Sequence, residues 1–145
     1  MEKKRVNIAL QGGGSHGAYT WGVLDSLLSD DRISVEGVCG TSAGGMNAAA
    51  VVMGIIKGGN KGARDLMRLF WEKVGESAKY SPIKPDPMKK LTKEFDIEQN
   101  PAYMMMQSMM GVLSPYQFNP QNKHPLQPII HELFDFQALQ QSTNP

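Results

Sequence analysis

Two short apolar runs, separated by a stretch with helical periodicity, open the chain. Residues 6–10 and residues 33–39 each have the length and composition of a buried strand. Between them, apolar residues recur every three or four positions, which predicts a helix over residues 16–29. A helix between two strands favours a parallel, right-handed βαβ unit. The apolar positions of that helix are Ala18, Trp21, Leu24, Leu27 and Leu28.

Two more helical patterns follow the second strand. Residues 45–56 are so uniformly apolar and rich in alanine that we expect a buried helix, ended by the Lys-Gly-Gly of residues 57–59. Residues 61–74 predict an amphipathic surface helix, in which Arg68 and Glu72 are spaced for an i,i+4 ion pair. Its expected inward face consists of Leu66, Leu69, Phe70 and Val74.

The rest of the chain has weaker patterns. Residues 81–87 hold three prolines and predict a connecting loop. Residues 101–113 predict a helix rich in methionine, and its methionines would form either ordinary core or a pliable acyl-binding surface. We expect residues 114–125 to lie extended and residues 126–136 to be helical. The inward residues of this last helix would be Leu126, Ile130, Leu133 and Phe134.

The composition narrows the class of protein. A chain of 145 residues that is 41% hydrophobic fits one globular domain. Its 15 basic and 14 acidic residues give no broad basic field, so we expect no nucleic-acid partner. The single cysteine, Cys39, excludes an internal disulfide framework and a multi-thiolate metal site, which favours a reducing, cytoplasmic compartment. Nothing in the sequence suggests metal ligation, and we expect neither a metal nor a cofactor.

The apolar runs are short by the standards of membrane segments. Residues 6–10 are too few for the core of a signal peptide, so we expect no export by that route. The longest strongly apolar stretch, residues 46–56, falls far below the ~20 residues that cross a bilayer. Any membrane contact is therefore expected to be peripheral.

A Gly-x-Ser-x-Gly motif stands at the predicted turn from the second strand into the buried helix. It consists of Gly40, Thr41, Ser42, Ala43 and Gly44. Such a turn pushes the serine hydroxyl out of the backbone, and its glycines let strand, helix and substrate approach closely. The positive end of the helix favours a developing negative charge. Because the motif alone is common by chance, an ordinary glycine-rich turn with Ser42 as N-cap is the alternative.

Three glycines, Gly12, Gly13 and Gly14, follow the first strand. Their backbone N–H groups, free of side chains, would form an oxyanion hole for acyl transfer. A rival interpretation is the dinucleotide fingerprint, since Gly12, Gly14 and Gly17 have its spacing and Glu36 stands about where its ribose-binding acid would. That acid belongs at the carboxyl end of the second strand, whereas Glu36 lies within it. A P-loop is disfavoured because no Gly-Lys-Ser/Thr follows the glycines.

Together these motifs resemble the patatin-like phospholipase family, in its bacterial type. The resemblance rests on Gln-Gly-Gly-Gly-Ser-His-Gly-Ala-Tyr at residues 11–19, Trp-Gly-Val-Leu-Asp at 21–25, Gly-Thr-Ser-Ala-Gly-Gly at 40–45 and Ser-Pro-Tyr-Gln-Phe-Asn-Pro at 114–120. It implies an α/β protein with a three-layer α/β/α fold and a largely parallel sheet. Residues 1–145 would be the N-terminal portion of a single patatin-like domain, truncated at its C-terminal side.

The resemblance also implies an activity, the hydrolysis of fatty acyl esters in phospholipids or related lipids by a serine–aspartate dyad without histidine. It makes Ser42 the nucleophile and Gly12, Gly13 and Gly14 the oxyanion loop. The family's aspartate stands in an Asp-Gly-Gly or Asp-Gly-Ala motif well beyond the serine, but no Asp-Gly pair occurs here. We therefore expect the aspartate to lie beyond these residues and the fragment alone to be nearly inactive. A non-catalytic lipid-binding module is the alternative.

Other polar residues have weaker claims to a catalytic role. Of the three histidines, only His16 is expected near the site, and it fits a polar lining better than a base. We expect Cys39 to be a small buried hydrophobe beneath the serine turn. No catalytic role is assigned to the aspartates in or beside predicted helices, which are Asp25, Asp65, Asp96 and Asp135.

Overall fold

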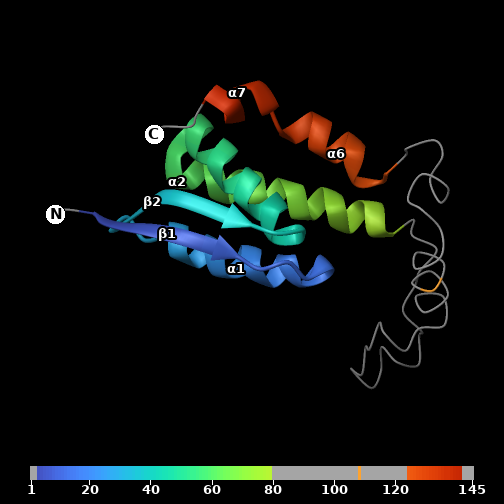
Figure 1. The fold of residues 1–145 in the computed structure, drawn as a ribbon, viewed down its shortest axis with the longest axis horizontal. Helices are drawn as coiled ribbons and strands as arrows, with labels where there is room; N and C mark the ends of the chain where they lie inside the picture. Colours follow the sequence, from blue (N-terminus) through green and yellow to red (C-terminus); the bar gives the residue numbers. More distant parts are fainter. Residues whose placement is uncertain (1–2, 80–107, 109–123, 142–145) are drawn as a thin grey trace, which may run out of the picture. The chain divides into compact units, whose positions relative to one another are not determined.

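Two strands and the helices around them make up the part of the chain that the computed structural model describes, residues 3–79, 108 and 124–141 (Figure 1). The predicted strand–helix–strand start is confirmed; the first strand begins two residues earlier than expected and the second ends one residue later. In chain order the elements are β1 (Lys4–Leu10), the 3₁₀ turn η1 (Gly14–His16), α1 (Gly17–Leu28), β2 (Ile33–Gly40), α2 (Ala43–Ala78), α6 (Leu126–Leu133) and α7 (Phe136–Gln141).

The strands β1 and β2 pair in parallel, as the helix between them requires. Lys4 lies opposite Ile33, and Leu10 lies opposite Gly40, with one register irregularity between Val6 and Asn7. The backbone N–H of Thr41 extends the pairing by donating to the carbonyl of Leu10 at 3.2 Å. The segments that follow both strands therefore begin side by side at one edge of the sheet.

The two faces of this sheet differ in burial. Leu10 is buried and Ile8 is half-buried, whereas Ala9 and its partner Cys39 are exposed. The expectation that Cys39 is buried is thus wrong. Paired residues of parallel strands point to the same face, so Cys39 shares with Ala9 the face that the described helices leave uncovered.

The helix α1 packs through Leu24 and Leu28, each only 2% exposed. It starts one residue later and ends one residue earlier than the predicted 16–29, because the residues before it form the 3₁₀ turn. At its end, Ser29 donates from its backbone to the carbonyl of Asp25 and from its hydroxyl to that of Ser26.

The 36-residue α2 is two helices joined at a kink. Gly58 and Gly59 have non-helical backbone angles, and Gly59 has φ 62°, which glycine adopts without strain. The second half then doubles back along the first (Figure 1). The two halves touch closely, since a Cβ placed on Gly54 would lie 2.3 Å from the Cα of Ala63. The predicted helix, glycine stop and second helix are confirmed.

The second half of α2 buries a different stripe from the one expected. Its fully buried apolar residues are Ala63, Met67 and Phe70, whereas Leu69 is 41% exposed. The expected pair of Arg68 with Glu72 is replaced by ion pairs to Asp65, at 3.6 Å from Arg68 and 2.6 Å from Lys61. The buried face of this helix is set by its close crossing with Gly54, which turns Ala63 inward and with it Met67 and Phe70, one and two turns further on.

The predicted helix 126–136 is in fact two, α6 and α7. The break follows Phe134, and the side chain of Asp135 caps α7 by accepting hydrogen bonds from the backbone of Gln137 and Ala138 at 3.0 and 3.1 Å. Leu133 and Phe134 are buried as expected, but Ile129 is buried in place of Ile130. Contacts to α2 are an edge-on ring pair, Phe134–Phe70 at 5.9 Å, and an ion pair, Glu132–Lys73 at 3.0 Å.

By their contacts, the residues divide into two compact units, Met1–Gly75 with Pro128–Pro145, and Glu76–Gln127. All the candidate site residues described below belong to the first. The predicted loop 81–87 lies outside the described residues, as do the predicted helix 101–113, apart from Ser108, and the predicted extended segment 114–125, apart from its last two residues. None of the helices within the described ranges is both long and apolar enough to cross a membrane.

Candidate active site

The turn from β2 into α2 holds the candidate nucleophile. Only Thr41 and Ser42 separate the two elements, and both are exposed. Ser42 has φ 52° and is the one non-glycine residue with positive φ among those the structure describes. Such a conformation costs an L-residue roughly 1–2 kcal/mol, so the surrounding backbone must hold it. Hydrogen bonds from Gly44 to Thr41 (2.9 Å) and from Met46 to Ser42 (3.2 Å) close the turn.

The glycines of the motif are required by close backbone contacts. A Cβ on Gly40 would lie 2.4 Å from the carbonyl of Gly44, and one on Gly44 would lie 2.3 Å from the carbonyl oxygen of Leu10. No side chain fits at either position because the neighbours are backbone atoms. The end of β1, the end of β2 and the start of α2 are thus packed against one another around Ser42.

The three glycines after β1 lie beside this turn. A Cβ on Gly12 would stand 3.0 Å from both the Cβ of Ser42 and the carbonyl oxygen of Thr41. Gly13 has φ 154° and Gly14 has φ 54°, values that other residues rarely adopt. The glycine loop, residues 12–14, therefore has a backbone shape that depends on glycine and touches the serine turn at Gly12.

His16 is joined to the glycine loop by two hydrogen bonds. Both its backbone N–H and its ring Nδ1 lie 3.0 Å from the carbonyl oxygen of Gly13. A carbonyl oxygen only accepts, so Nδ1 carries a proton and donates. His16 thus holds the loop through the carbonyl of Gly13, and its Nδ1–H donates there, which leaves Nε2 as the acceptor nitrogen of the neutral ring.

The start of α1 is fastened to α2 by a buried amide. Asn47 is fully buried, donates from Nδ2 to the carbonyl of Gly17 at 2.9 Å, and accepts at Oδ1 from the indole N–H of Trp71 at 2.8 Å. A Cβ on Gly17 would lie 2.7 Å from the Trp71 ring and 2.9 Å from the Cβ of Ala43. Sequence reasoning missed Asn47, although it is the one uncharged polar side chain within the apolar stretch 45–56.

With this geometry described, the chain was compared with known proteins. A family model described as patatin-like phospholipase matches residues 8–140, which include the glycine loop and the serine turn. The chain belongs to the patatin-like phospholipase family. No curated protein and no solved structure matches it. Family membership confirms the expected α/β class and places the chain among lipid acyl hydrolases.

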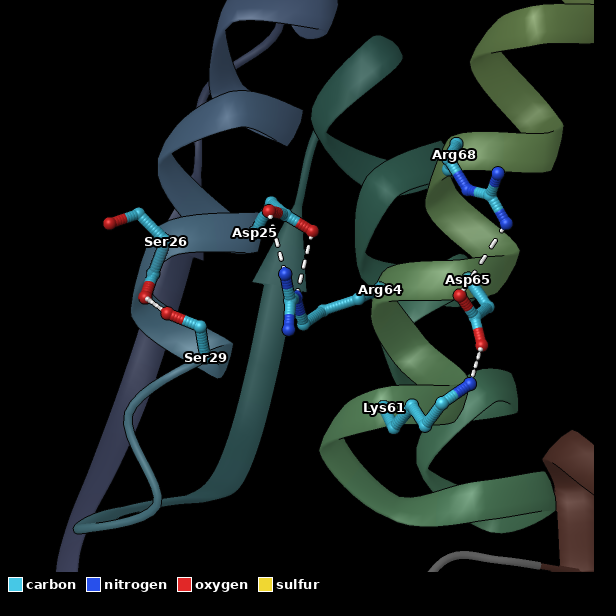
Figure 2. Close-up of polar contacts among 7 residues, drawn as sticks. All are labelled: Asp25, Ser26, Ser29, Lys61, Arg64, Asp65 and Arg68. Carbon is cyan, nitrogen blue, oxygen red and sulfur yellow. Dashed lines mark hydrogen bonds and ion pairs between the residues drawn. The ribbon is translucent and has the colours of Figure 1, made fainter.

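Two of the described aspartates, Asp25 and Asp65, have basic partners. Arg64 donates to both carboxylate oxygens of Asp25, at 2.9 and 3.2 Å, and joins α1 to the second half of α2 (Figure 2). The hydrogen bond from Arg64 lowers the pKa of Asp25. Lys61 likewise lowers the pKa of Asp65, mainly through its hydrogen bond. A general base needs the opposite environment, one that raises the pKa of its carboxyl toward neutrality.

Glu36, the acidic residue that a dinucleotide site would need, forms an ion pair. Glu36 pairs with Arg5 of the neighbouring strand at 2.9 Å, in the interior of β2 rather than at its end. The end of β2, where a ribose-binding acid belongs, is occupied by the serine turn. This arrangement suits a patatin-like phospholipase and leaves the dinucleotide interpretation without its acidic residue.

Proposed function

We propose that this patatin-like phospholipase is a serine hydrolase of fatty acyl esters, with Ser42 as nucleophile and the N–H groups of the glycine loop as the oxyanion hole. One observation carries the proposal: Ser42 is held exposed at φ 52° while Gly12 touches it from the adjacent strand end. A strained serine at a strand-to-helix turn, beside a backbone free of side chains, is the arrangement that acyl transfer requires.

The proposed reaction runs in two halves. The Oγ of Ser42 attacks the ester carbonyl carbon, its proton passes to the base, and the carbonyl oxygen becomes an oxyanion that the loop N–H groups bind. Collapse of this intermediate breaks the bond to the alcohol, which leaves with the proton. Water then attacks the acyl-serine in the same way, releasing the fatty acid and restoring Ser42. Loss of one oxyanion donor typically costs ~3 kcal/mol of barrier.

We assign the base to an aspartate outside residues 1–145. Among the described aspartates, Asp25 pairs with Arg64, Asp30 with Arg32 and Asp65 with Lys61, while Asp135 caps α7. Asp31 precedes β2, at the opposite end of that strand from Ser42, and Asp86 and Asp96 lie outside the described residues. No Asp-Gly pair occurs in the sequence. We also propose that the enzyme is cytoplasmic and meets lipid peripherally at a membrane surface, which the short apolar runs support.

A fluorophosphonate probe tests the nucleophile. The full-length gene product should be labelled at Ser42, and labelling should vanish in Ser42→Ala. The matched control is Ser15→Ala, which removes another exposed serine hydroxyl, in the 3₁₀ turn η1 that overlaps the end of the glycine loop. Labelling that survives in Ser42→Ala would overturn the assignment, and an unlabelled wild type would favour a non-catalytic lipid-binding module.

The location of the base is tested with the same protein. Residues 1–145 alone should hydrolyse a short-chain nitrophenyl ester roughly 10²- to 10⁴-fold more slowly than the full-length product, because the base is missing. Equal rates per mole of soluble protein would show that a base lies within these residues.

A further inference from the structure

We propose that Asn47 and Trp71 are positioning residues that hold the glycine loop in register with Ser42. The proposal rests on the proposed function, since it concerns the oxyanion loop of that reaction. It assigns a role to two side chains that neither touch the substrate nor belong to the serine motif.

The orientation of the Asn47 amide is fixed by chemistry on both sides. The indole N–H of Trp71 only donates, so the group facing it at 2.8 Å must be the Asn47 carbonyl oxygen. The carbonyl of Gly17 only accepts, so the group facing it at 2.9 Å must be the Asn47 NH₂. Removing the Trp71 donor therefore frees the amide to turn and weakens its hold on Gly17.

Gly17 is the point at which these contacts reach the loop. It follows the loop by three residues and begins α1. The ring of Trp71 and the Cβ of Ala43 both press on it, so closely that no side chain fits. Ala43 is the residue after Ser42. The same small region therefore fixes both the start of α1, which carries the glycine loop, and the start of α2, which carries the nucleophile.

The Trp71 side chain is itself held by the core. Its ring meets that of Phe70 edge-on at 5.4 Å, and Phe70 is 2% exposed and packs in turn on Phe134. Asn47 is fully buried, where an amide is stabilising only if its hydrogen bonds are made. An apolar residue would pack there without that requirement, but it would not fix the position of Gly17. Oxyanion donors must lie about 2.7–3.1 Å from the oxyanion, a range of only a few tenths of an ångström, so a fixed position of the loop favours catalysis.

The test compares two tryptophans in the full-length protein. Trp71→Phe keeps an aromatic side chain on α2 but removes both the donor to Asn47 and the far ring atoms, Cζ2 and Cη2, that lie nearest Gly17. Trp21→Phe is the matched control, because the Trp21 Nε1 is buried and has no hydrogen-bond partner among the described residues. Active sites are counted by fluorophosphonate titration, so that kcat is expressed per titrated site and a loss of folded protein does not enter it.

We expect Trp71→Phe to lower kcat per site about tenfold with KM nearly unchanged, a smaller loss than the ~10²-fold of a 1 Å misplacement. Asn47→Ala should lower it further, and Trp21→Phe should leave it unchanged. Amide hydrogen exchange in residues 12–19 should speed up several-fold in Trp71→Phe and remain as in the wild type in Trp21→Phe.

The outcomes separate the two proposals. Wild-type kcat per site and wild-type exchange in both Trp71→Phe and Asn47→Ala would overturn the positioning role. An unlabelled wild type would overturn the proposed function, and the exchange comparison would then still decide whether these two side chains hold the loop. Equal losses in Trp71→Phe and Trp21→Phe would show a general packing effect and would also overturn the role.

Discussion

The backbone strain at Ser42 makes a prediction whose sign is unusual. In most positions, replacing alanine by glycine destabilises a protein, because glycine loses more chain entropy on folding. At Ser42 we expect the reverse. The variant Ser42→Gly should be more stable than Ser42→Ala, although both lack the hydroxyl and both should be inactive under the proposed function.

The magnitude follows from the φ of 52° at this residue. A Cβ in the left-handed region costs roughly 1–2 kcal/mol, and Ser42→Ala retains that cost. Glycine removes it but loses roughly 0.5–1 kcal/mol through the greater freedom of the unfolded chain. The difference leaves Ser42→Gly more stable by about 0.5–1 kcal/mol.

The assay is urea unfolding of the full-length variants, followed by circular dichroism. The control is Ser26, an exposed serine in the interior of α1, where Ser26→Gly should be less stable than Ser26→Ala by about 1 kcal/mol. The difference in unfolding free energy between the glycine and the alanine variant should thus have opposite signs at Ser42 and Ser26. A glycine penalty at Ser42 equal to that at Ser26 would refute the left-handed conformation and, with it, the strained serine turn.

Two further predictions concern the packing around the site. Gly44→Ala should destabilise the protein by about 1–3 kcal/mol in urea unfolding, because the new Cβ would lie 2.3 Å from a backbone oxygen. The control Gly45→Ala should be neutral or slightly stabilising, because its Cβ would lie 3.4 Å from its nearest neighbour. Similar losses of stability in both variants would contradict the close contact at Gly44. Asp25→Asn should lower Tm slightly at pH 7, because the folded-state pKa of Asp25 is depressed by the hydrogen bond from Arg64 and its stabilisation is present above the unfolded pKa. That difference should begin to shrink below pH about 4 and disappear below the lowered pKa of the folded chain, and a difference independent of pH would show that the carboxylate charge plays no part.

Sequence reasoning succeeded where the determinants are local. The strands, α1 and the glycine stop in α2 were placed within one or two residues, because short apolar runs, helical spacing and glycine act through near neighbours. The parallel pairing followed from the helix between the strands. For the site, the sequence predicted a strand-to-helix serine turn after β2 and a glycine loop after β1, and the structure places Gly12 against Ser42.

Sequence reasoning failed to predict burial where burial depends on contacts with segments distant along the chain. Cys39 stands in a run that reads as buried on both sides, but its face of the sheet is uncovered by the described helices. The helical spacing predicts Leu69 on the inward face, but Leu69 is 41% exposed, whereas Ala63 is buried at the close crossing with Gly54, which admits only a small residue. Asn47 was overlooked because its partners lie 30 residues before it and 24 residues after it. No local pattern reports such contacts.

The reversal of α2 at Gly58 and Gly59 bears on how the chain assembles. It returns Arg64 to Asp25 and Trp71 to both Asn47 and Gly17, so that these contacts link parts of the chain that all lie between β1 and Trp71. Closing loops of this length costs somewhat less entropy than joining the two ends of a whole domain, although the cost rises only slowly with length. The strained turn and the glycine loop are therefore shaped by one contiguous segment, from β1 to Trp71. In a chain synthesised from its N-terminus, that segment is complete as soon as Trp71 has emerged, whereas the packing of Phe70 against Phe134 must wait for α6.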